Sequence, residues 1–493
     1  MQQHQIDLLK SQTVAPQQLF IDGRWQSGTG SQLDIISPVN GEVITTIERA
    51  SRADMQTAIK AARMSFDDGR WANRAPGERK QVLLRLADLI QQNALELAVL
   101  GVRDNGTEIS FAINAEPGSA AGTFRYYAEA IDKIYGEIAP TNPNVLGLIH
   151  KQPVGVVGAI VPWNMPLMIG AWKLAPALIA GNSVVLKPAE EASLTLLRLA
   201  ELAAEAGIPD GVFNVVTGQG SEVGEELALS MDVDVLVFTG SANTGRRLLE
   251  YSARSNMKRC YLELGGKSAN IVFADAPDLD KAAMVSAMAI FRNSGQICVA
   301  GSRLLVEHTI HDEFVTKVAQ HAENLRVGNP LKLNSQIGAI NSHRQLTSNL
   351  NFVAKAKEQG ANLVTGGEQI LQASGGYYMQ PTIFTGVESH HHLSQAEVFG
   401  PVLGVTPFNS EAQAVALAND CNYGLAGAAW TSNLGRAHRM VKAVNTGGMF
   451  INTYGGADVT MPLGGVKQSG NGVDRSLHAM DKYINLKTAW IQF

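Results

Sequence analysis

One cysteine of the chain lies in a setting that suits a nucleophile. Cys298 ends the sequence FRNSGQIC over residues 291–298, which follows an apolar, helix-like run over 282–291. The Gly295-Gln296 pair is expected to end this helix and to present the thiol at an irregular bend. Because a thiol attacks only as the thiolate and its free pKa is near ~8.5, a nucleophilic Cys298 needs a base close by.

Glu263 is the best candidate for that base. It is a lone carboxylate between leucines and glycines in the sequence LELGGK over 262–267, a setting that favours a raised pKa and general-base chemistry. Both residues also have a simpler explanation, since a lone cysteine is often a small buried hydrophobe and a Glu before Gly-Gly often caps a strand. The neighbouring motifs decide between these interpretations.

Five short motifs occur together in one order along the chain. They are PWN at 162–164, KPAE at 187–190, ELGGK at 263–267, GQIC at 295–298 and EVFGP at 397–401. With these motifs the chain resembles the aldehyde dehydrogenase superfamily from about residue 20 to residue 490. Within it, the sequences over 127–133 and 453–462 are similar to γ-glutamyl-γ-aminobutyraldehyde dehydrogenase-like enzymes. The resemblance implies an NAD(P)-dependent enzyme that oxidises an aldehyde to a carboxylic acid.

The elements that must position these motifs alternate along the chain. A near-continuous apolar run over 154–162 is typical of a central parallel strand, and strand-like and helix-like runs then alternate from residue 183 to residue 255. This alternation predicts an α/β fold with a doubly wound parallel sheet. Ligands of such sheets bind beyond the carboxyl ends of the strands, where Asn164, Lys187 and Gly240-Ser241 are expected.

The length of 493 residues predicts more than one domain, because single cores stop growing at ~250 to 300 residues. The resemblance implies the aldehyde dehydrogenase fold, with a Rossmann-like cofactor domain, an α/β catalytic domain and a β oligomerisation extension. The first ordered element is expected at Leu19, and the C-terminal strand is expected to pair with the extension across subunits. The predicted boundaries are 19–134 and 151–262 for NAD binding, 263–447 for catalysis, 135–150 and 480–493 for oligomerisation, and 448–479 for a substrate-channel loop that returns to the cofactor domain.

The cofactor motifs are informative mainly in combination. The sequence GQGSEVG over 218–224 has one residue too many for a dinucleotide fingerprint, whereas FTGSANTG over 238–245 predicts a strand entering a helix whose amides can receive a pyrophosphate. The carboxylate of Glu190 would accept hydrogen bonds from a ribose and oppose a 2′-phosphate, which favours NAD with NADP possible. By resemblance, the cofactor-binding residues are Trp163, Lys187, Glu190, Gly240, Ser241, Gly245, Glu397 and Phe399.

The resemblance also implies a reaction sequence. Cys298 adds to the aldehyde carbonyl, and the amide of Asn164 stabilises the oxyanion together with the backbone N–H of Cys298. Hydride passes to NAD, and Glu263 activates the water that hydrolyses the thioester. Retention of Glu263 argues against relatives that release the acyl group to coenzyme A.

The substrate is less well defined. Of the aromatic positions that line the channel in relatives for small aliphatic aldehydes, Trp172 remains, whereas Met165, Arg292, Ala457 and Leu463 occupy the others. The candidate substrate residues are therefore Asp458, Trp172, Arg292 and Leu463. Asp458 could bind the amine of an amino- or guanidino-alkyl aldehyde from polyamine breakdown. Arg292 could instead bind the carboxylate of a semialdehyde, which is the alternative, or of a γ-glutamyl group, and the two charges together would suit a zwitterionic end. A departure at Val473-Asp474 is expected not to affect the chemistry.

The composition limits the other classes of function. A formal net charge of −5 and a pI of about 6.1 leave no basic surface for nucleic acid, and the longest apolar run, over 154–163, is too short for the ~20 residues of a membrane span. Three cysteines without a CxxC pair and a polar N-terminus predict a cytoplasmic protein. His390, His391 and His392 are consecutive, so no metal site is predicted. A homodimer or homotetramer is expected.

Two other classes remain as alternatives. A cysteine esterase without redox function could use Cys298 and Glu263 for acyl transfer, but it would not need the cofactor motifs. A scaffold without activity would be expected to have lost the thiol, the base or the amide, and the chain keeps all three.

Overall fold

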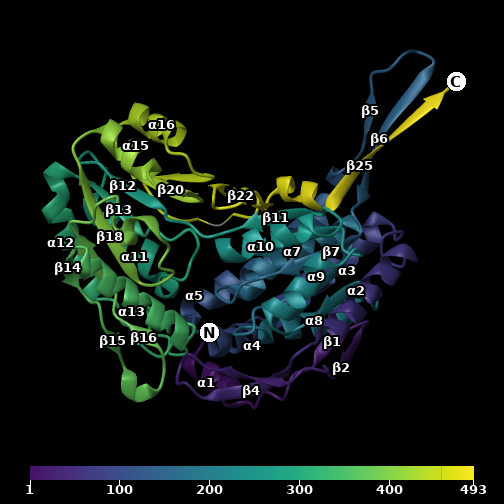
Figure 1. Cartoon of the computed structure of the whole chain (residues 1–493), viewed down its shortest axis with the longest axis horizontal. Helices are drawn as coiled ribbons and strands as arrows, with labels where there is room; N and C mark the ends of the chain where they lie inside the picture. Colours follow the sequence, from purple (N-terminus) through teal and green to yellow (C-terminus); the bar gives the residue numbers. More distant parts are fainter. Residues whose placement is uncertain (457) are drawn as a thin grey trace.

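A computed structural model describes residues 1–456 and 458–493, so Ala457 lies outside the described residues. The chain forms two large sheets with helices on their faces and a narrow third sheet that projects from the body (Figure 1). The N-terminal part builds the first sheet, and the segment drawn in green builds the second. The α/β prediction is confirmed by this architecture.

The first sheet is parallel at its centre, and every residue of β7, β8 and β10 is buried. Such strands carry near-continuous apolar sequence because helices cover both faces. An antiparallel hairpin extends one edge through an Asp22-Gly23 turn in which both residues have positive φ. The strand order is β11 (Arg259–Glu263), β10 (Val235–Thr239), β7 (Val156–Ile160), β8 (Ser183–Lys187), β9 (Phe213–Val215), β1 (Leu19–Ile21) and β2 (Arg24–Gln26).

Helices of the N-terminal half cover this sheet. Two of them begin at serine caps, Ser51 before α2 and Ser241 before α10, whose hydroxyls accept a backbone N–H three residues on. The helices are α2 (Arg52–Asp67), α3 (Pro76–Gln92), α4 (Ala94–Asn105), α5 (Ile109–Ile113), α6 (Ser119–Ala130), α7 (Pro166–Ala180), α8 (Leu194–Ala206), α9 (Glu225–Leu229) and α10 (Ala242–Ala253), with a π-helical turn at Asn114–Gly118.

The second sheet is also doubly wound. All its strand pairs are parallel except β14 with β17. Its strand order is β14 (Asn362–Thr365), β17 (Thr382–Thr385), β18 (Val402–Phe408), β13 (Arg303–Glu307), β12 (Ala269–Val272), β20 (Ala426–Trp430) and β21 (Gly448–Ile451). Its helices are α11 (Leu279–Phe291), α12 (His311–Glu323), α13 (His343–Glu358), α14 (His392–Gln395), α15 (Glu411–Asn419) and α16 (Leu434–Ala443).

The structure corrects two expectations about the chain ends. The first ordered element is helix α1 (Gln3–Ser11), which comes before Leu19. It is held in place because Ile6 is fully buried against apolar side chains of α4. The C-terminal strand β25 (Ile484–Gln492) pairs antiparallel with β6 (Val145–Pro153) of the same chain, so the expected pairing across subunits is wrong. Strand β5 (Glu137–Ala139) lies on the other side of β6.

Two predicted segments are not separate in the sheets. Strand β6 runs past the boundary at residue 150, and β21, which lies wholly within the predicted 448–479 segment, pairs with β20 at the edge of the second sheet. The remaining short strands include the hairpin β3 (Gln32–Ile36) and β4 (Val43–Glu48), and the pairs β15 (Gln369–Ile370) with β16 (Tyr378–Met379), β19 (Tyr423–Gly424) with β23 (Val466–Lys467), and β22 (Leu463–Gly464) with β24 (Val473–Asp474).

Candidate active site

The carboxyl edge of the first sheet gathers several predicted site residues. Strands β8, β7, β10 and β11 are parallel neighbours, so their carboxyl ends lie at one edge of the sheet. Asn164 follows β7, Lys187 ends β8, and Glu263 ends β11. Thr239 at the end of β10 pairs with Glu263, and Ser241 follows it as the cap of α10. The predicted location beyond the strands is confirmed for this edge.

The loop that carries the thiol has a specific backbone shape. Helix α11 ends at Phe291, and Asn293, Ser294 and Gly295 then have φ values of 50°, 53° and 74°. A Cβ on Gly295 would lie 2.1 Å from the carbonyl oxygen of Gly400, so only glycine fits. The buried Gln296 side chain donates to the Asn293 carbonyl at 3.1 Å and accepts from the Asn341 backbone at 2.8 Å. These bonds fix the loop immediately before Cys298.

Asn164 connects this loop to the first sheet. Its Nδ2 donates a 2.8 Å hydrogen bond to the Gln296 carbonyl, and its side chain is buried. An amide nitrogen has two N–H donors, and the bond to Gln296 uses one of them. The other donor remains for an oxygen atom close to the thiol.

The charge of Glu263 acts on the Cys298 thiol. Burial, together with the negative charges of Glu397 and Glu263, raises the pKa of the Cys298 thiol to about 12. Burial first, and the charge of Asp474 second, raise the pKa of Glu263 well above its usual range. Within the described residues, the buried Oε1 of Glu263 has no hydrogen-bond partner. A buried carboxyl group with a free oxygen next to a protonated thiol can serve as its base.

Asp474, which the sequence analysis kept apart from the chemistry, has a charge that acts on Glu263. Its carboxylate is fully buried and accepts hydrogen bonds from Lys173 of α7 at 3.0 Å and from Lys482 at 2.5 Å. Burial alone would raise the pKa of Asp474, but the two lysine charges hold it below its ordinary value. The ion triad Lys173–Asp474–Lys482 acts on the pKa of Glu263 through the charges of all three members.

Glu397 and Phe399 reach the same region from the second sheet. The carboxylate of Glu397 accepts a 3.0 Å hydrogen bond from the N–H of Gly266, and burial raises its pKa to about 7. A Cβ on Gly266 would lie 2.5 Å from the carbonyl oxygen of Cys298. The ring of Phe399 meets that of Trp163 edge to face, with ring centroids 5.3 Å apart. These contacts bring the motifs at 162–164, 263–267, 295–298 and 397–401 together.

The predicted adenosine end of the cofactor site also assembles. Lys187 is buried and forms a 3.2 Å ion pair with Glu190, whose carboxylate also accepts the Gly220 N–H at 2.7 Å. Ser241 caps α10, and Gly245 packs in its first turns against Leu264. The buried hydroxyl of Thr239 has no partner within the part of the chain that the structure describes. The arrangement fits a dinucleotide, because the N-terminus of α10 can receive a phosphate and the Glu190 carboxylate can accept hydrogen bonds from a ribose. The free Thr239 hydroxyl lies at the same edge of the sheet.

The predicted substrate residues fall into two groups. Trp172 is buried on α7, and Leu463 is half-buried on β22 and packs against the same core. Asp458 is exposed, and its carboxylate accepts from the hydroxyl and the N–H of Thr460 at 2.6 and 2.8 Å. Arg292 is exposed and lies over the Phe111 ring, 5.0 Å from its centroid.

The cation whose charge acts on Asp458 is Arg475. Hydrogen bonds from Thr460 lower the pKa of Asp458 first, and the charge of Arg475 lowers it further. Sequence reasoning missed Arg475, although its position one residue after Asp474 was a signal that this segment departs from the family pattern.

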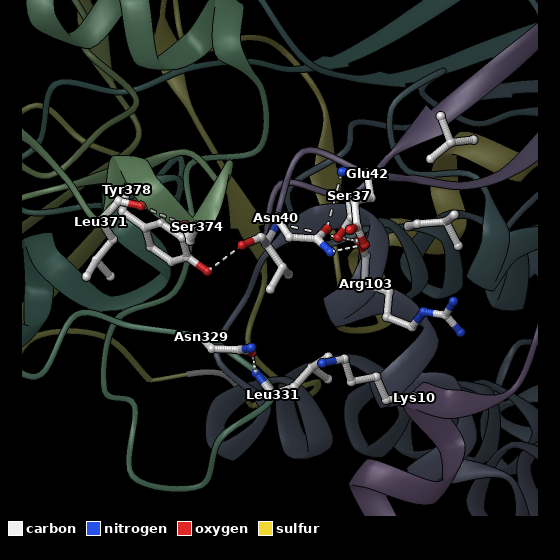
Figure 2. Close-up of a pocket in the computed structure, with 13 residues that line it drawn as sticks. Lys10, Ser37, Asn40, Glu42, Arg103, Asn329, Leu331, Leu371, Ser374 and Tyr378 are labelled. Carbon is white, nitrogen blue, oxygen red and sulfur yellow. Dashed lines mark hydrogen bonds between the residues drawn. The ribbon is translucent and has the colours of Figure 1, made fainter.

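A pocket and a possible metal-binding cluster lie outside the predicted site. A pocket of about 430 Å³ lies between α4, the β3–β4 turn and the segment before β16, and Figure 2 shows Lys10, Arg103, Asn40 and Tyr378 around it. It contains none of the predicted site residues. Among the described residues, Glu388, His390 and His391 could hold a metal ion, but Nδ1 of His391 accepts the Glu388 N–H and Nδ1 of His390 lies 3.3 Å from the Glu388 carboxylate.

No described helix has the length and apolar character of a membrane span.

Comparison with known proteins identifies the family. The model of the Aldehyde dehydrogenase family matches residues 25–489. The chain belongs to the aldehyde dehydrogenase family. This confirms the family, the enzyme class and the fold that the five motifs predicted.

Individual members of the family are similar over nearly the whole chain. The NADP/NAD-dependent aldehyde dehydrogenase PuuC of Escherichia coli (strain K12) is 48% identical over 474 residues, which cover 96% of this chain and 95% of PuuC. The crystal structure of an indole-3-acetaldehyde dehydrogenase complexed with NAD+ has a TM-score of 0.98 at 47% identity, with both chains fully covered. That of γ-glutamyl-γ-aminobutyraldehyde dehydrogenase from Burkholderia cenocepacia J2315 has a TM-score of 0.98 at 45% identity, again with full coverage of both.

Proposed function

We propose that this aldehyde dehydrogenase uses Cys298 as its nucleophile, Glu263 as its base and Asn164 as its oxyanion donor. The observation that carries the proposal is the meeting of two sheets at the thiol. Asn164 from the first sheet bonds to the loop of Cys298, and the buried Glu263 carboxyl group acts on the pKa of that thiol. Nucleophile, base and amide donor are the three groups that acyl chemistry on an aldehyde carbon needs.

The proposed steps follow from the protonation states. Because the pKa of Cys298 is raised to about 12, its proton must leave as the thiol attacks, and Glu263 accepts it. The second N–H of Asn164 donates to the oxygen of the tetrahedral thiohemiacetal. After oxidation to the thioester, Glu263 releases the thiol proton to solvent and then takes a proton from water, whose oxygen attacks the acyl carbon. The carboxylic acid leaves and Cys298 regains its proton.

The cofactor of this reaction is NAD, with NADP also accepted. When bound, NAD accepts the hydride from the thiohemiacetal carbon. Lys187, Glu190, Ser241 and the first turn of α10 would hold its adenosine and phosphates, whereas Glu397, Phe399 and Trp163 would hold the other end. Because Lys187 pairs with Glu190, the negative charge of Glu190 is partly neutralised and its repulsion of a 2′-phosphate is weaker. This agrees with the name of PuuC, which includes both NADP and NAD.

The substrate class that we propose is an amino- or guanidino-alkyl aldehyde of the kind that polyamine breakdown supplies. The similarity to a γ-glutamyl-γ-aminobutyraldehyde dehydrogenase supports it, as does the exposed carboxylate of Asp458 beside the segment of Leu463. A semialdehyde with a carboxylate is the second candidate, because the buried cation Arg475 lies over the ring of the predicted substrate residue Trp172.

A homo-oligomer is proposed from the projecting sheet of β5, β6 and β25. Leu486, Trp490 and Phe493 at its end are 68%, 67% and 78% exposed, which is unusual for large apolar side chains on an ordered strand. A second copy of the chain would cover them and give a homodimer or homotetramer. The three free cysteines agree with a reducing, cytoplasmic location.

Light scattering after gel filtration tests the assembly. The double variant Leu486→Asp/Trp490→Asp should elute as a smaller species than the wild type, whereas Lys487→Gln on the other face of the same strand should not. A wild-type monomer would contradict the proposal.

The enzymatic proposal is tested by following NADH formation with 4-aminobutanal, succinic semialdehyde and propanal. Wild type should reduce NAD with an aldehyde of the series, and Cys298→Ala should not, whereas Cys421→Ala, at a half-buried thiol outside the site, should retain activity. If the protein hydrolysed an activated ester but reduced no NAD with any aldehyde, the esterase alternative would replace the proposal.

A further inference from the structure

A threonine between α4 and α5 contacts the loop over 292–298 that carries the proposed nucleophile, the thiol loop. The buried hydroxyl of Thr107 donates a 2.8 Å hydrogen bond to Oδ1 of Asn293 in this loop. The carboxyl group of the next residue, Glu108, accepts the backbone N–H of Asn293 at 3.2 Å. Asn293 has a φ of 50°, a conformation that residues other than glycine keep only when their surroundings fix it. Thr107 and Glu108 thus hold Asn293 by its side chain and by its backbone.

The Thr107 hydroxyl determines which way the buried Asn293 amide faces. The amide oxygen can only accept hydrogen bonds and the amide nitrogen can only donate them. Because Oδ1 accepts from Thr107, Nδ2 faces the carbonyl oxygens of Gln296 and Asn164, at 3.3 and 3.5 Å. The Gln296 carbonyl also accepts the side-chain amide of Asn164 at 2.8 Å. Two side-chain amides therefore meet at one carbonyl oxygen, and a reversed Asn293 amide would place its oxygen against two others.

The backbone next to Thr107 is packed so closely that it cannot shift easily. Gly106 ends α4 with a φ of 84°, and its carbonyl accepts the Ala339 N–H at 2.9 Å. A Cβ on Gly338 would lie 2.0 Å from the same carbonyl oxygen. The Gly338 carbonyl in turn accepts the Ser294 hydroxyl of the thiol loop at 3.0 Å. Thr107 therefore belongs to a fixed support that contacts the thiol loop at a second point.

We propose that Thr107 is a positioning residue of the active site, whose hydroxyl acts through Asn293 and the Gln296 carbonyl to keep the free N–H of Asn164 directed at the oxyanion. This inference rests on the proposed function and adds a residue that acts only through others. A donor stabilises the transition state best when its direction is fixed before the charge develops. Loss of the hydroxyl would leave the buried Oδ1 of Asn293 without a donor and let this amide turn, which would disturb the carbonyl that Asn164 contacts.

The first test is the single-turnover rate of NADH formation for Thr107→Val, which keeps the shape of threonine without the hydroxyl. The rate should fall roughly 10-fold with unchanged KM for the aldehyde and for NAD, because a small displacement of an oriented group slows the chemical step. Thr107→Ser should recover most of the wild-type rate. Thr123→Val is the matched control, because the buried Thr123 hydroxyl donates to the Ser119 carbonyl of its own helix, and it should leave the rate unchanged.

A double-mutant cycle with Asn164→Ala separates positioning from a general structural defect. In the Asn164→Ala background, Thr107→Val should slow NADH formation by less than about 2-fold, because the donor that Thr107 orients is absent. An equal loss in both backgrounds, or a wild-type rate for Thr107→Val alone, would overturn the proposal.

Asn293→Gly decides if Thr107→Val does not fold, because glycine adopts the left-handed conformation freely and this change removes only the amide. It should show the same loss and the same dependence on Asn164, and a wild-type rate would overturn the proposal. In a crystal structure of either variant, the Asn164 amide should be displaced from the Gln296 carbonyl, and an unchanged contact would overturn the inference whatever the activity. A wild-type rate for Asn164→Ala, or absence of activity with every aldehyde, would instead refute the proposed function.

Discussion

The side-chain amide of Asn164 donates a 2.8 Å hydrogen bond to the carbonyl oxygen of Gln296, two residues before the proposed nucleophile. One bond thus joins the carboxyl edge of the first sheet to the thiol loop of the second. It orients the amide plane, because the donor used toward Gln296 fixes the direction of the other N–H. The oxyanion donor is therefore held in place before the substrate arrives, which is the condition for electrostatic stabilisation of a transition state.

Removal of this donor should slow the chemical step. Asn164→Ala is expected to lower kcat by about 100-fold to 1000-fold with little change in KM, since the oxygen carries full charge only in the transition state. Single-turnover NADH formation is the measurement. Asn445→Ala, at an exposed asparagine of the second sheet's periphery, serves as the control. An unchanged single-turnover rate for Asn164→Ala would show that another group stabilises the oxyanion.

Loss of the base should separate the two halves of the reaction. Glu263→Gln is expected to form close to one equivalent of NADH per site more slowly than wild type, because the thiol loses its base. It should then turn over at least about 100-fold more slowly than wild type, because thioester hydrolysis needs the base as well. Rapid-mixing absorbance measures the first equivalent, and Glu388→Gln, at an exposed carboxylate, should behave as wild type.

The same carboxyl group sets a pH dependence. Burial raises the pKa of Glu263 well above its usual range, so the active, deprotonated form is gained only as the pH rises through that raised value. Wild-type hydrolysis should therefore increase with pH, and Glu263→Gln should lose this limb of the profile. A variant with the wild-type profile would assign the limb to another group.

Glu190 should control the choice between the two cofactors. Glu190→Gln removes the negative charge that opposes a 2′-phosphate while Lys187 remains, so the ratio of kcat/KM for NADP to that for NAD should rise roughly 10-fold. Glu191→Gln is the matched control, since the next residue pairs with the exposed Arg344. Steady-state kinetics with both cofactors gives the ratio, and an equal change in the two variants would contradict a specific role for Glu190.

Glu116 should make the protein less stable at high pH. Burial raises the pKa of its carboxyl group to about 8, above the unfolded value of 4.5, while one oxygen accepts the Met168 N–H and the other has no partner in the described residues. Below the unfolded pKa the contribution to stability is complete, and it is lost as the pH rises through about 8. The free energy of unfolding should fall by up to about 1.4 kcal/mol per pH unit between these values.

Urea denaturation between the unfolded and the folded pKa of Glu116 tests this dependence. The difference between wild type and Glu116→Gln isolates the contribution of this residue, because the amide cannot ionise and other buried acids remain in both proteins. Parallel stability curves for the two proteins would show that Glu116 is ionised in the folded state.

Local patterns in the sequence were sufficient for the strands and for the edge where they end. The apolar runs of β7, β8 and β10 reflect burial on both faces, and this requirement is written into consecutive residues. Helix α1 was missed because its pattern is polar and only Ile6 is fully buried, so the contact with α4 could not be predicted from the segment itself.

The sequence by itself determined the order of the motifs, the two alternating regions and the identities of Cys298, Glu263 and Asn164, because these depend on residue type and on short-range periodicity. Only the tertiary structure decided that Asp474 is held by Lys173 of a distant helix, that the charge of Arg475 acts on Asp458, and that β25 pairs with β6 of its own chain. These relationships join residues 17 to more than 300 positions apart. Their energies come from burial and charge that the folded chain creates, and no local pattern in the sequence records which partner a side chain will meet.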